Sequence, residues 1–373
     1  MRVEKVTAHR LSLPLVRPFR TSFGTEYDKD VILLEVTTDS GATGWGECVA
    51  APDPSYSHEF NDAALLVLRD HLVPRVLDLD VEAEGVPALL SAVRGHPMAR
   101  GALELAILDA QLRQEETSFA EFLGATRTSI PCGVSTGIPA DDSMDTLVAE
   151  VDSYVADGYR RIKLKIEPGW DIEPTRVIRE RHPDIPLQVD ANQAYSREHI
   201  DHLSALDDFD LLLIEQPIHE DDYLGLRQLA ERMSTPLCLD ESILSRDNAE
   251  SLIDYGACEV VNVKAGRVGG YLCARAIHDL CLDRGVPVWC GGMVETGIGR
   301  AANVALAAMP GFTLPGDTSS SSRFFATDVT EPLVMSAEGL MEVPTGPGLG
   351  VTPIPELLAR FTVTTYDLVG GTR

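Results

Sequence analysis

The chain has 373 residues, 44% of them hydrophobic, which is enough to bury a sizeable core in two or three structural units. Its 58 acidic and 31 basic residues give a net charge of −27, which would repel phosphate backbones and anionic lipid surfaces. These numbers argue against nucleic acid and membrane partners, and the apolar runs are far shorter than the roughly 18 residues of a membrane span.

The N-terminal segment predicts no export signal. Its short apolar patch is interrupted by Pro14 and carries no small-residue cleavage pattern. The seven cysteines of the chain are scattered and never form a CxxC motif, which is typical of reduced, buried thiols. We therefore expect a cytoplasmic protein.

From about residue 129 onward, β-branched and aliphatic runs alternate with helical patterns. Eight runs predict strands: SIPCGVSTG, RIKLKI, PLQVDAN, LLLIEQP, PLCLDES, VVNVKAG, VPVWCGG and FTLPGD. Regular alternation of strand and helix implies a parallel sheet, and eight such units favour a closed α/β barrel.

The segment RIKLKI, residues 161–166, has a cation at every second position. Taken alone, it would fit a half-exposed antiparallel strand whose charged side chains face water. However, charged residues recur at or near the C-terminal ends of successive predicted strands: Lys165, Asp190, Glu215, Asp240 and Lys264. Because an α/β barrel assembles its chemistry at this mouth, we expect Lys163 and Lys165 to point inward, toward a site.

The three acids in this series form an all-oxygen ligand set with no His or Cys nearby, which suits a hard cation such as Mg²⁺. Mn²⁺ or another divalent cation could substitute. The alternative is a ring of salt bridges in which the acids neutralise the lysines. We favour the metal site because buried ion clusters without a metal are costly to desolvate.

The two lysines at the mouth suggest acid/base chemistry. A free lysine, with a pKa of roughly 10.4, is a poor base at neutral pH. Burial and nearby cations, Lys163 beside Lys165 and Arg267 beside Lys264, are expected to lower the lysine pKa values. Such a lysine could remove the proton α to a substrate carboxylate, giving an enediolate that the metal stabilises. Two opposed lysines permit racemisation, and one permits elimination on a single face.

Specific motifs follow one another along nearly the whole chain: RPFRTSFGT, GWGEC, MARGALELAILDA, IPCGVSTGI, RIKLKIEPGWD, LQVDAN, LLIEQP, CLDESI, VNVKAGRVGGY, GGMVETGIGRAANVALA and TLPGDTS. Together they resemble the enolase superfamily, in its muconate-cycloisomerase-like subgroup. The resemblance is closest to o-succinylbenzoate synthases that also racemise N-acylamino acids, including N-succinylamino acids.

The resemblance implies an enolase-type (β/α)7β barrel, a modified TIM barrel, at residues 126–324. It also implies an α+β capping domain at residues 1–125, to which residues 325–373 return. Asp190, Glu215 and Asp240 would bind the divalent ion, and Lys165 and Lys264 would be the acid/base pair. The implied reaction is dehydration to o-succinylbenzoate in menaquinone biosynthesis, racemisation of N-acylamino acids, or both, in a symmetric homo-oligomer.

A second set of residues is expected to contact the small carboxylate substrate: Lys163, Asn192, Ser135, Phe23, Tyr56, Gly292, Met293 and Phe324. For Phe23 and Tyr56 the alternative is ordinary packing in the core of the cap. Glu241 and Arg267 are expected to support the site from behind. Strand alternation points Glu241 away from Asp240, so packing is its alternative role.

Other functions remain open. A muconate cycloisomerase shares the five charged residues, so only the cap and mouth contacts separate it from a synthase or racemase. A dipeptide epimerase is expected to carry paired acids at the eighth strand, where this chain supplies only Asp317. A catalytically silent binding barrel is the alternative of another class. The sequence leaves undecided whether the synthase or the racemase activity is physiological.

Overall fold

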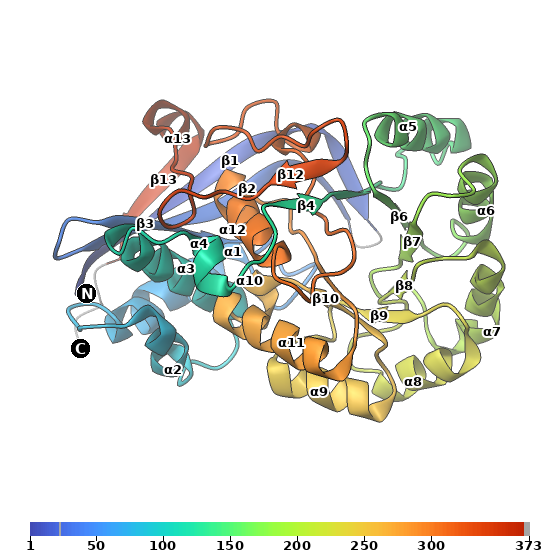
Figure 1. The fold of residues 1–373 in the computed structure, drawn as a ribbon, viewed down its shortest axis with the longest axis horizontal. Coiled ribbons are helices and arrows are strands. Elements are labelled where there is room, and N and C mark those ends of the chain that lie inside the picture. The colour runs from blue at the N-terminus through green and yellow to red at the C-terminus, as the bar shows by residue number, and fades with distance from the viewer. Residues whose placement is uncertain (22–23, 369–373) are drawn as a thin grey trace.

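The computed structural model describes residues 1–21 and 24–368 (Figure 1). Two units are visible, an antiparallel sheet with its own helices and a parallel sheet wrapped by helices. The antiparallel sheet has the order β13-β1-β2-β3. Its strands are β1 (Val3–Thr21), β2 (Gly24–Thr38), β3 (Thr43–Cys48) and β13 (Thr362–Asp367). The last strand of the chain thus pairs with the first.

Helix α3 packs closely on strand β3. Gly44 and Gly46 of the GWG sequence make this contact possible, since a Cβ atom at either position would overlap backbone atoms of α3. The aliphatic side chains of β2 and α3 are buried in the same core. The helices of this unit are α1 (Asn61–Val67), α2 (Val86–Leu90), α3 (Pro97–Gln114) and α4 (Phe119–Leu123).

The parallel sheet has seven strands, in the order β11-β10-β9-β8-β7-β6-β5. They are β5 (Gly133–Ser135), β6 (Arg161–Lys165), β7 (Leu187–Asp190), β8 (Ile214–Glu215), β9 (Leu237–Leu239), β10 (Val260–Val263) and β11 (Val288–Cys290). Strand β4 (Ser129–Pro131) pairs instead with β12 (Leu340–Glu342). The parallel pairing of β6 with β5 and β7 shows that the antiparallel alternative for residues 161–166 is wrong.

Helices follow the strands and cover the outside of the curled sheet (Figure 1). They are α5 (Met144–Ala156), α6 (Ile172–Arg181), α7 (Ile200–Leu203), α8 (Tyr223–Arg232), α9 (Arg246–Tyr255), α10 (Ala265–Val268), α11 (Tyr271–Arg284) and α12 (Gly297–Ala307). The last helix, α13 (Pro355–Phe361), precedes β13.

The predicted eighth strand, residues 312–317, is wrong as a regular strand. Phe312 forms an isolated parallel bridge with Val288 of β11, and Gly316 forms one with Cys132, next to β5. Pro315 has no N–H to donate to a ladder, which interrupts regular pairing here. The segment nevertheless lies between the two edges of the sheet and connects them through these bridges.

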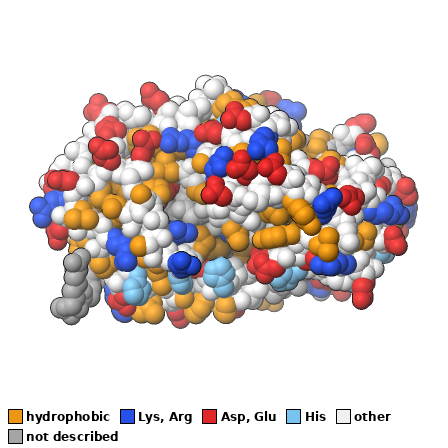
Figure 2. All heavy atoms as spheres, turned by 90° about the horizontal axis from the view of Figure 1, so that it is seen from below, with side chains coloured by type: hydrophobic (Ala, Val, Ile, Leu, Met, Phe, Trp, Pro, Cys, Tyr) orange, Lys and Arg blue, Asp and Glu red, His pale blue; other side chains and the backbone are white. Residues whose placement is uncertain are grey.

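The surface carries acidic and basic side chains interspersed with apolar ones, as Figure 2 shows for one face. Within residues 1–21 and 24–368, no helix combines the length and apolar character needed to cross a membrane.

Candidate active site

The C-terminal ends of the parallel strands bring the predicted charged residues together. Lys165 pairs in register with Asp190, and Asp190 with Glu215, so these three side chains lie on neighbouring strands. Asp240 follows the end of β9 and Lys264 the end of β10. The three acids are at most 1% exposed, and the two lysines are also buried. The predicted convergence of these five residues at the mouth is thus observed.

Lys163 lies deeper in the barrel and pairs with several acids. Its Nζ lies 2.7 Å from Asp317 Oδ2, 3.0 Å from Glu215 Oε2 and 3.4 Å from Asp190 Oδ2. It also lies 4.7 Å from the centre of the Trp289 ring, a cation–π contact that closes the bottom of the site. The ammonium group of Lys163 is therefore surrounded by side chains of the protein itself.

Lys165 is held between an acid and an amide. Its Nζ donates to Asp190 Oδ2 at 2.6 Å and to Asn192 Oδ1 at 2.5 Å. Asn192 in turn donates from Nδ2 to Glu241 Oε1 at 3.0 Å. This hydrogen bond fits the expected supporting role of Glu241 behind the site and not its alternative role in packing. Strand β9 ends at Leu239, so strict alternation no longer governs the direction of Glu241.

Lys264 is held by Asp240 and lies against Tyr56 from the cap. Its Nζ lies 2.9 Å from Asp240 Oδ2 and 3.4 Å from the Tyr56 hydroxyl. Arg267 pairs with the other oxygen of Asp240 and donates to the Tyr56 hydroxyl at 3.0 Å. Asp240 therefore forms ion pairs with both Lys264 and Arg267, and the Tyr56 hydroxyl lies beside these two cations at the cavity.

The expected lowering of the lysine pKa is wrong at Lys264. Burial is the largest single influence and lowers the pKa of Lys264, but Asp240, Tyr56 and Glu241 together raise the pKa well above its usual value. Burial likewise lowers the pKa of Lys163, and Asp317, Glu215 and Asp190 together raise it more. Neighbouring cations alone would lower these lysine pKa values, but carboxylates lie within 3 Å of both lysine nitrogens. Lys264 is thus cationic at neutral pH in this state.

The acids respond to the same contacts. Burial raises the pKa of Asp240, but Arg267 and Lys264 outweigh it and hold the pKa below its usual value. Glu215 differs, because burial and the neighbouring Asp190 charge raise its pKa to about 8, despite Lys163. The Glu215 carboxylate is therefore the least compensated negative charge of the three.

The carboxylates are turned toward the cations. Across the described part of the chain, no group of three His, Cys, Asp or Glu side chains is arranged to hold a metal ion. The arrangement is the ring of salt bridges that was the alternative to a metal site. The donor chemistry still fits a hard divalent cation, since three buried carboxylates stand on consecutive strands and Glu215 lacks full compensation. The metal role of Asp190, Glu215 and Asp240 stays a prediction.

Several residues that follow the barrel strands have an unusual backbone conformation, with a positive φ angle. The φ angles of Asn192, Gln216 and Val294 are +41°, +32° and +60°, in the left-handed region. A β-branched residue such as Val294 rarely adopts this conformation, and such strain gathers at functional sites. These turns redirect the chain around the cavity.

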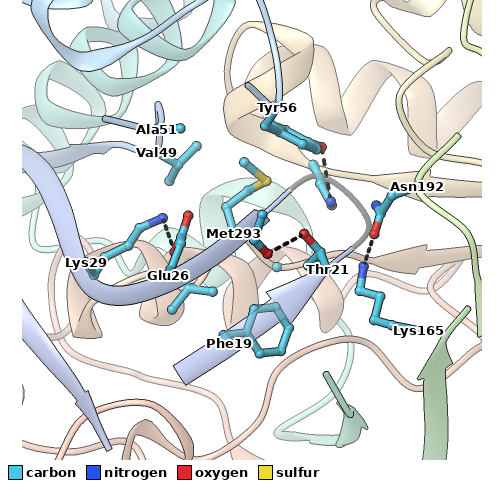
Figure 3. A pocket seen from close by; sticks show the side chains of 14 residues that line it. Phe19, Thr21, Glu26, Lys29, Val49, Ala51, Tyr56, Lys165, Asn192 and Met293 are labelled. Carbon is cyan, nitrogen blue, oxygen red and sulfur yellow. Dashed lines mark hydrogen bonds and ion pairs between the residues drawn. The ribbon is translucent and has the colours of Figure 1, made fainter. Parts of the chain in front are cut away.

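A cavity lies between the cap and the mouth (Figure 3) and holds about 580 Å³ of empty space, part of it open to solvent. Its lining includes six of the predicted residues: Tyr56, Lys165, Asn192, Lys264, Gly292 and Met293. An adjoining hollow is lined by Ser135, Lys163 and Phe324. Phe23 lies outside the described residues.

Several lining residues were not predicted. The cap supplies Phe19, Thr21, Glu26, Lys29, Val49 and Ala51. Phe19 packs edge-to-face against Phe324 at 5.9 Å, and its place in the RPFRTSFG motif was an available signal. Asn262 donates to Glu215 Oε1 at 2.7 Å, which its shared strand face with Lys264 could have indicated. No sequence signal marked Lys29, because the flanking Asp28 and Asp30 are typical of an exposed strand.

Two family models match the chain. The enolase C-terminal domain-like model matches residues 146–357, and the N-terminal domain model of mandelate racemase and muconate lactonizing enzyme matches residues 5–124. An N-succinylamino acid racemase from an Amycolatopsis species is 56% identical over 97% of this chain and 98% of its own. An o-succinylbenzoate synthase from Bacillus subtilis is 42% identical, with 98% of each chain covered.

A solved structure agrees with these matches. The crystal structure of an enolase superfamily member from Listeria innocua has a TM-score of 0.94 and 39% identity, and covers 98% of this chain and 99% of that one. The curled parallel sheet and the separate antiparallel sheet of this chain are thus a known arrangement. The chain belongs to the mandelate racemase and muconate lactonizing enzyme family of the enolase superfamily.

Proposed function

We propose that the protein removes the proton α to a carboxylate and acts as an o-succinylbenzoate synthase, as an N-succinylamino acid racemase, or as both. The names of its relatives support this activity, since one is a racemase and another a synthase. The supporting observation in the structure is that Lys165 and Lys264 line one cavity from strands separated by β7, β8 and β9.

The two lysines suit different steps. Racemisation needs one group to remove the α-proton and another to supply a proton on the opposite face. Lys264, whose raised pKa keeps it protonated, is placed to act as the proton donor and to stabilise negative charge with its ammonium group. Lys165 becomes the base once it gives up its proton. For dehydration, Lys165 would take the α-proton and return a proton to the departing hydroxyl group, which leaves as water.

Asp190, Glu215 and Asp240 would hold Mg²⁺ or a similar divalent cation. When bound, the cation would stabilise the negative charge that develops on the substrate carboxylate. Asn192 and Glu241 would orient Lys165 through the chain of hydrogen bonds that joins them. Arg267 would orient Tyr56 and Asp240 beside Lys264.

Dipeptide epimerase activity is disfavoured by the placement of Asp317. That carboxylate pairs with Lys163 at 2.7 Å and with Arg161 at 2.8 Å, and these two cations hold its pKa well below the usual value, despite burial. Its oxygens are thus engaged by protein cations and are poorly placed to receive a substrate ammonium group.

The test is proton exchange and turnover in the wild type and in Lys165→Ala and Lys264→Ala. In deuterated buffer with Mg²⁺, the wild type should exchange the α-proton of an N-succinylamino acid, as followed by NMR. Each variant should lose racemisation by about 10²- to 10⁴-fold, the usual contribution of a general acid or base. Unchanged turnover in either variant would show that the assignment is wrong. Dipeptides and muconate serve as competing substrates.

The remaining expectations concern the whole protein. We infer from the resemblance that it is a cytoplasmic homo-oligomer with domain boundaries near residues 125 and 324. Sedimentation and limited proteolysis would test the assembly and the boundaries.

A further inference from the structure

An ion pair between a buried lysine and a half-buried glutamate stands in the cap wall of the cavity, away from the five charged residues of the mouth. Lys29 and Glu26, both on β2, line the cavity that Lys165 and Asn192 line from the barrel. Figure 3 shows Lys29 and Glu26 facing each other on one side, with Lys165 and Asn192 on the opposite side. Lys29 is only 4% exposed, although it belongs to the loop-proximal part of the cap.

Lys29 and Glu26 make no hydrogen bond to each other, although they form an ion pair. The Lys29 Nζ lies 4.0 Å from Glu26 Oε2, beyond hydrogen-bond distance. Glu26 Oε2 is buried and has no hydrogen-bond partner among the described residues. An ammonium group has three donors, and a buried charge is costly unless it is paired and hydrogen-bonded. A ligand carboxylate that accepts hydrogen bonds from Lys29 would therefore offset the free-energy cost of burying this ammonium group.

The adjacent carboxylate of Asp30 has another cation as its partner. Asp30, next to Lys29 in sequence, is engaged by Arg10, whose guanidinium lies 2.5 Å from Asp30 Oδ2. The β1–β2 pairing is regular up to the pairs Leu13–Lys29 and Pro14–Asp28, and its register shifts between Pro14 and Phe19. Lys29 thus stands at the end of the regular ladder, where β2 lines the cavity.

We propose that Lys29 is a specificity-determining residue, which receives an anionic group at the far end of the substrate. The substrate class is a dianion with one carboxylate beside the reacting carbon, at Lys165 and Lys264, and a second carboxylate in the cap, at Lys29. Glu26 is the counter-ion that holds Lys29 when this subsite is empty. This inference rests on the proposed function, because that function places the first carboxylate at the mouth.

The test compares two substrates that differ in the far carboxylate, an N-succinylamino acid and the N-butyryl derivative of the same amino acid. Loss of a charge-assisted hydrogen bond should lower kcat/KM of Lys29→Met for the succinyl substrate by about 10- to 100-fold. The value for the butyryl substrate should stay within about twofold. Lys29→Arg should retain most of the preference, and Glu26→Gln should preserve or increase it.

Lys5→Met is the matched control, since Lys5 lies in the same sheet but pairs with Asp367 at the surface. An equal loss for both substrates in Lys29→Met, or no loss for either, would overturn the proposal. So would a preference that is lost in Glu26→Gln but kept in Lys29→Met, because Glu26 and not Lys29 would then set the preference.

A binding measurement separates this inference from the proposed function. Calorimetric titration of both compounds into the wild type and Lys29→Met, with Mg²⁺ present, needs no turnover. If neither compound exchanges its α-proton but the succinyl compound binds more tightly only when Lys29 is present, the proposed function fails and the subsite stands. If exchange occurs and binding is indifferent to Lys29, the subsite fails and the function stands.

Discussion

Glu104 is a buried acid of α3 that does not line the cavity, and burial changes its protonation. Its Oε1 accepts the Leu272 N–H at 3.0 Å at the start of α11, while its Oε2 is buried with no hydrogen-bond partner among the described residues. Burial raises the pKa of Glu104 to about 7, and backbone hydrogen bonds oppose this only in part.

Glu104→Gln should change how stability depends on pH. The folded protein binds this proton more tightly than the unfolded chain, whose glutamate titrates near 4.3. The free energy of unfolding of the wild type therefore falls as pH rises from about 4.5 to about 7, and the loss is complete above pH 7. The glutamine variant lacks this loss, so it should gain about 2–3 kcal/mol relative to the wild type between pH 4.5 and 8. Urea unfolding at both pH values measures the gain, and a difference that is constant with pH would contradict it.

At the same scale, the sequence predicted residues whose direction a regular strand controls. Lys165, Asp190 and Glu215 sit at strand ends in mutual register, so spacing alone brought them together. Strand alternation gave no guide to Glu241, because this residue lies beyond its strand, where backbone turns decide direction. The pKa of Lys264 was misjudged because it depends on distances to acids that no spacing reveals.

At the scale of elements, the contact between β3 and α3 depends on glycine. Gly46→Ala would drive a methyl group into the backbone oxygen of Ala102, and helix backbone cannot rotate away as a side chain can. The variant should lose about 3 kcal/mol or more of unfolding free energy, at the upper end of overpacking effects. Gly85→Ala is the control, because nothing lies within 4 Å of its Cβ position, and it should stay within about 0.5 kcal/mol. Equal midpoints of urea unfolding for both variants would refute the packing argument.

The same elements show why the parallel sheet could be predicted more completely than its closure. Seven strands carry aliphatic runs that recur at a regular period, and all seven pair in parallel. The eighth run has the same composition but includes Pro315 and Gly316, and only isolated bridges form. Pro315 has no N–H to donate, and a Cβ atom at Gly316 would lie only 2.7 Å from the Cys290 carbonyl oxygen. Both are local effects that the period of the aliphatic runs does not reveal.

At the scale of the molecule, the cap and the mouth are joined through buried polar contacts. Glu47 of β3 accepts the N–H groups of Thr296 and Gly299, both at 2.9 Å, at the start of α12. This helix follows Met293 and Val294, which line the cavity. The cap is therefore anchored beside the residues that shape the site, so cap residues such as Lys29 and Tyr56 can hold fixed positions over the barrel.

Divalent cations should stabilise the whole molecule if Asp190, Glu215 and Asp240 hold one. Binding only to the folded state adds about 2.7 kcal/mol at a concentration one hundred times Kd, so Tm should rise by several degrees when MgCl2 replaces chelator at matched ionic strength. The rise has a structural reason, since a cation would compensate Glu215, whose pKa is raised to about 8 by burial and by Asp190.

Glu215→Gln and Asp240→Asn should each lose most of this rise, because each removes a charged ligand from the three. Asp201→Asn is the control, since its side chain is 92% exposed and pairs with Arg232 at the surface, and it should keep the full rise. The measurement needs no substrate, so it tests the metal site independently of turnover. A rise of equal size in all four proteins would place the cation elsewhere, and no rise in the wild type would contradict the metal site at the three acids.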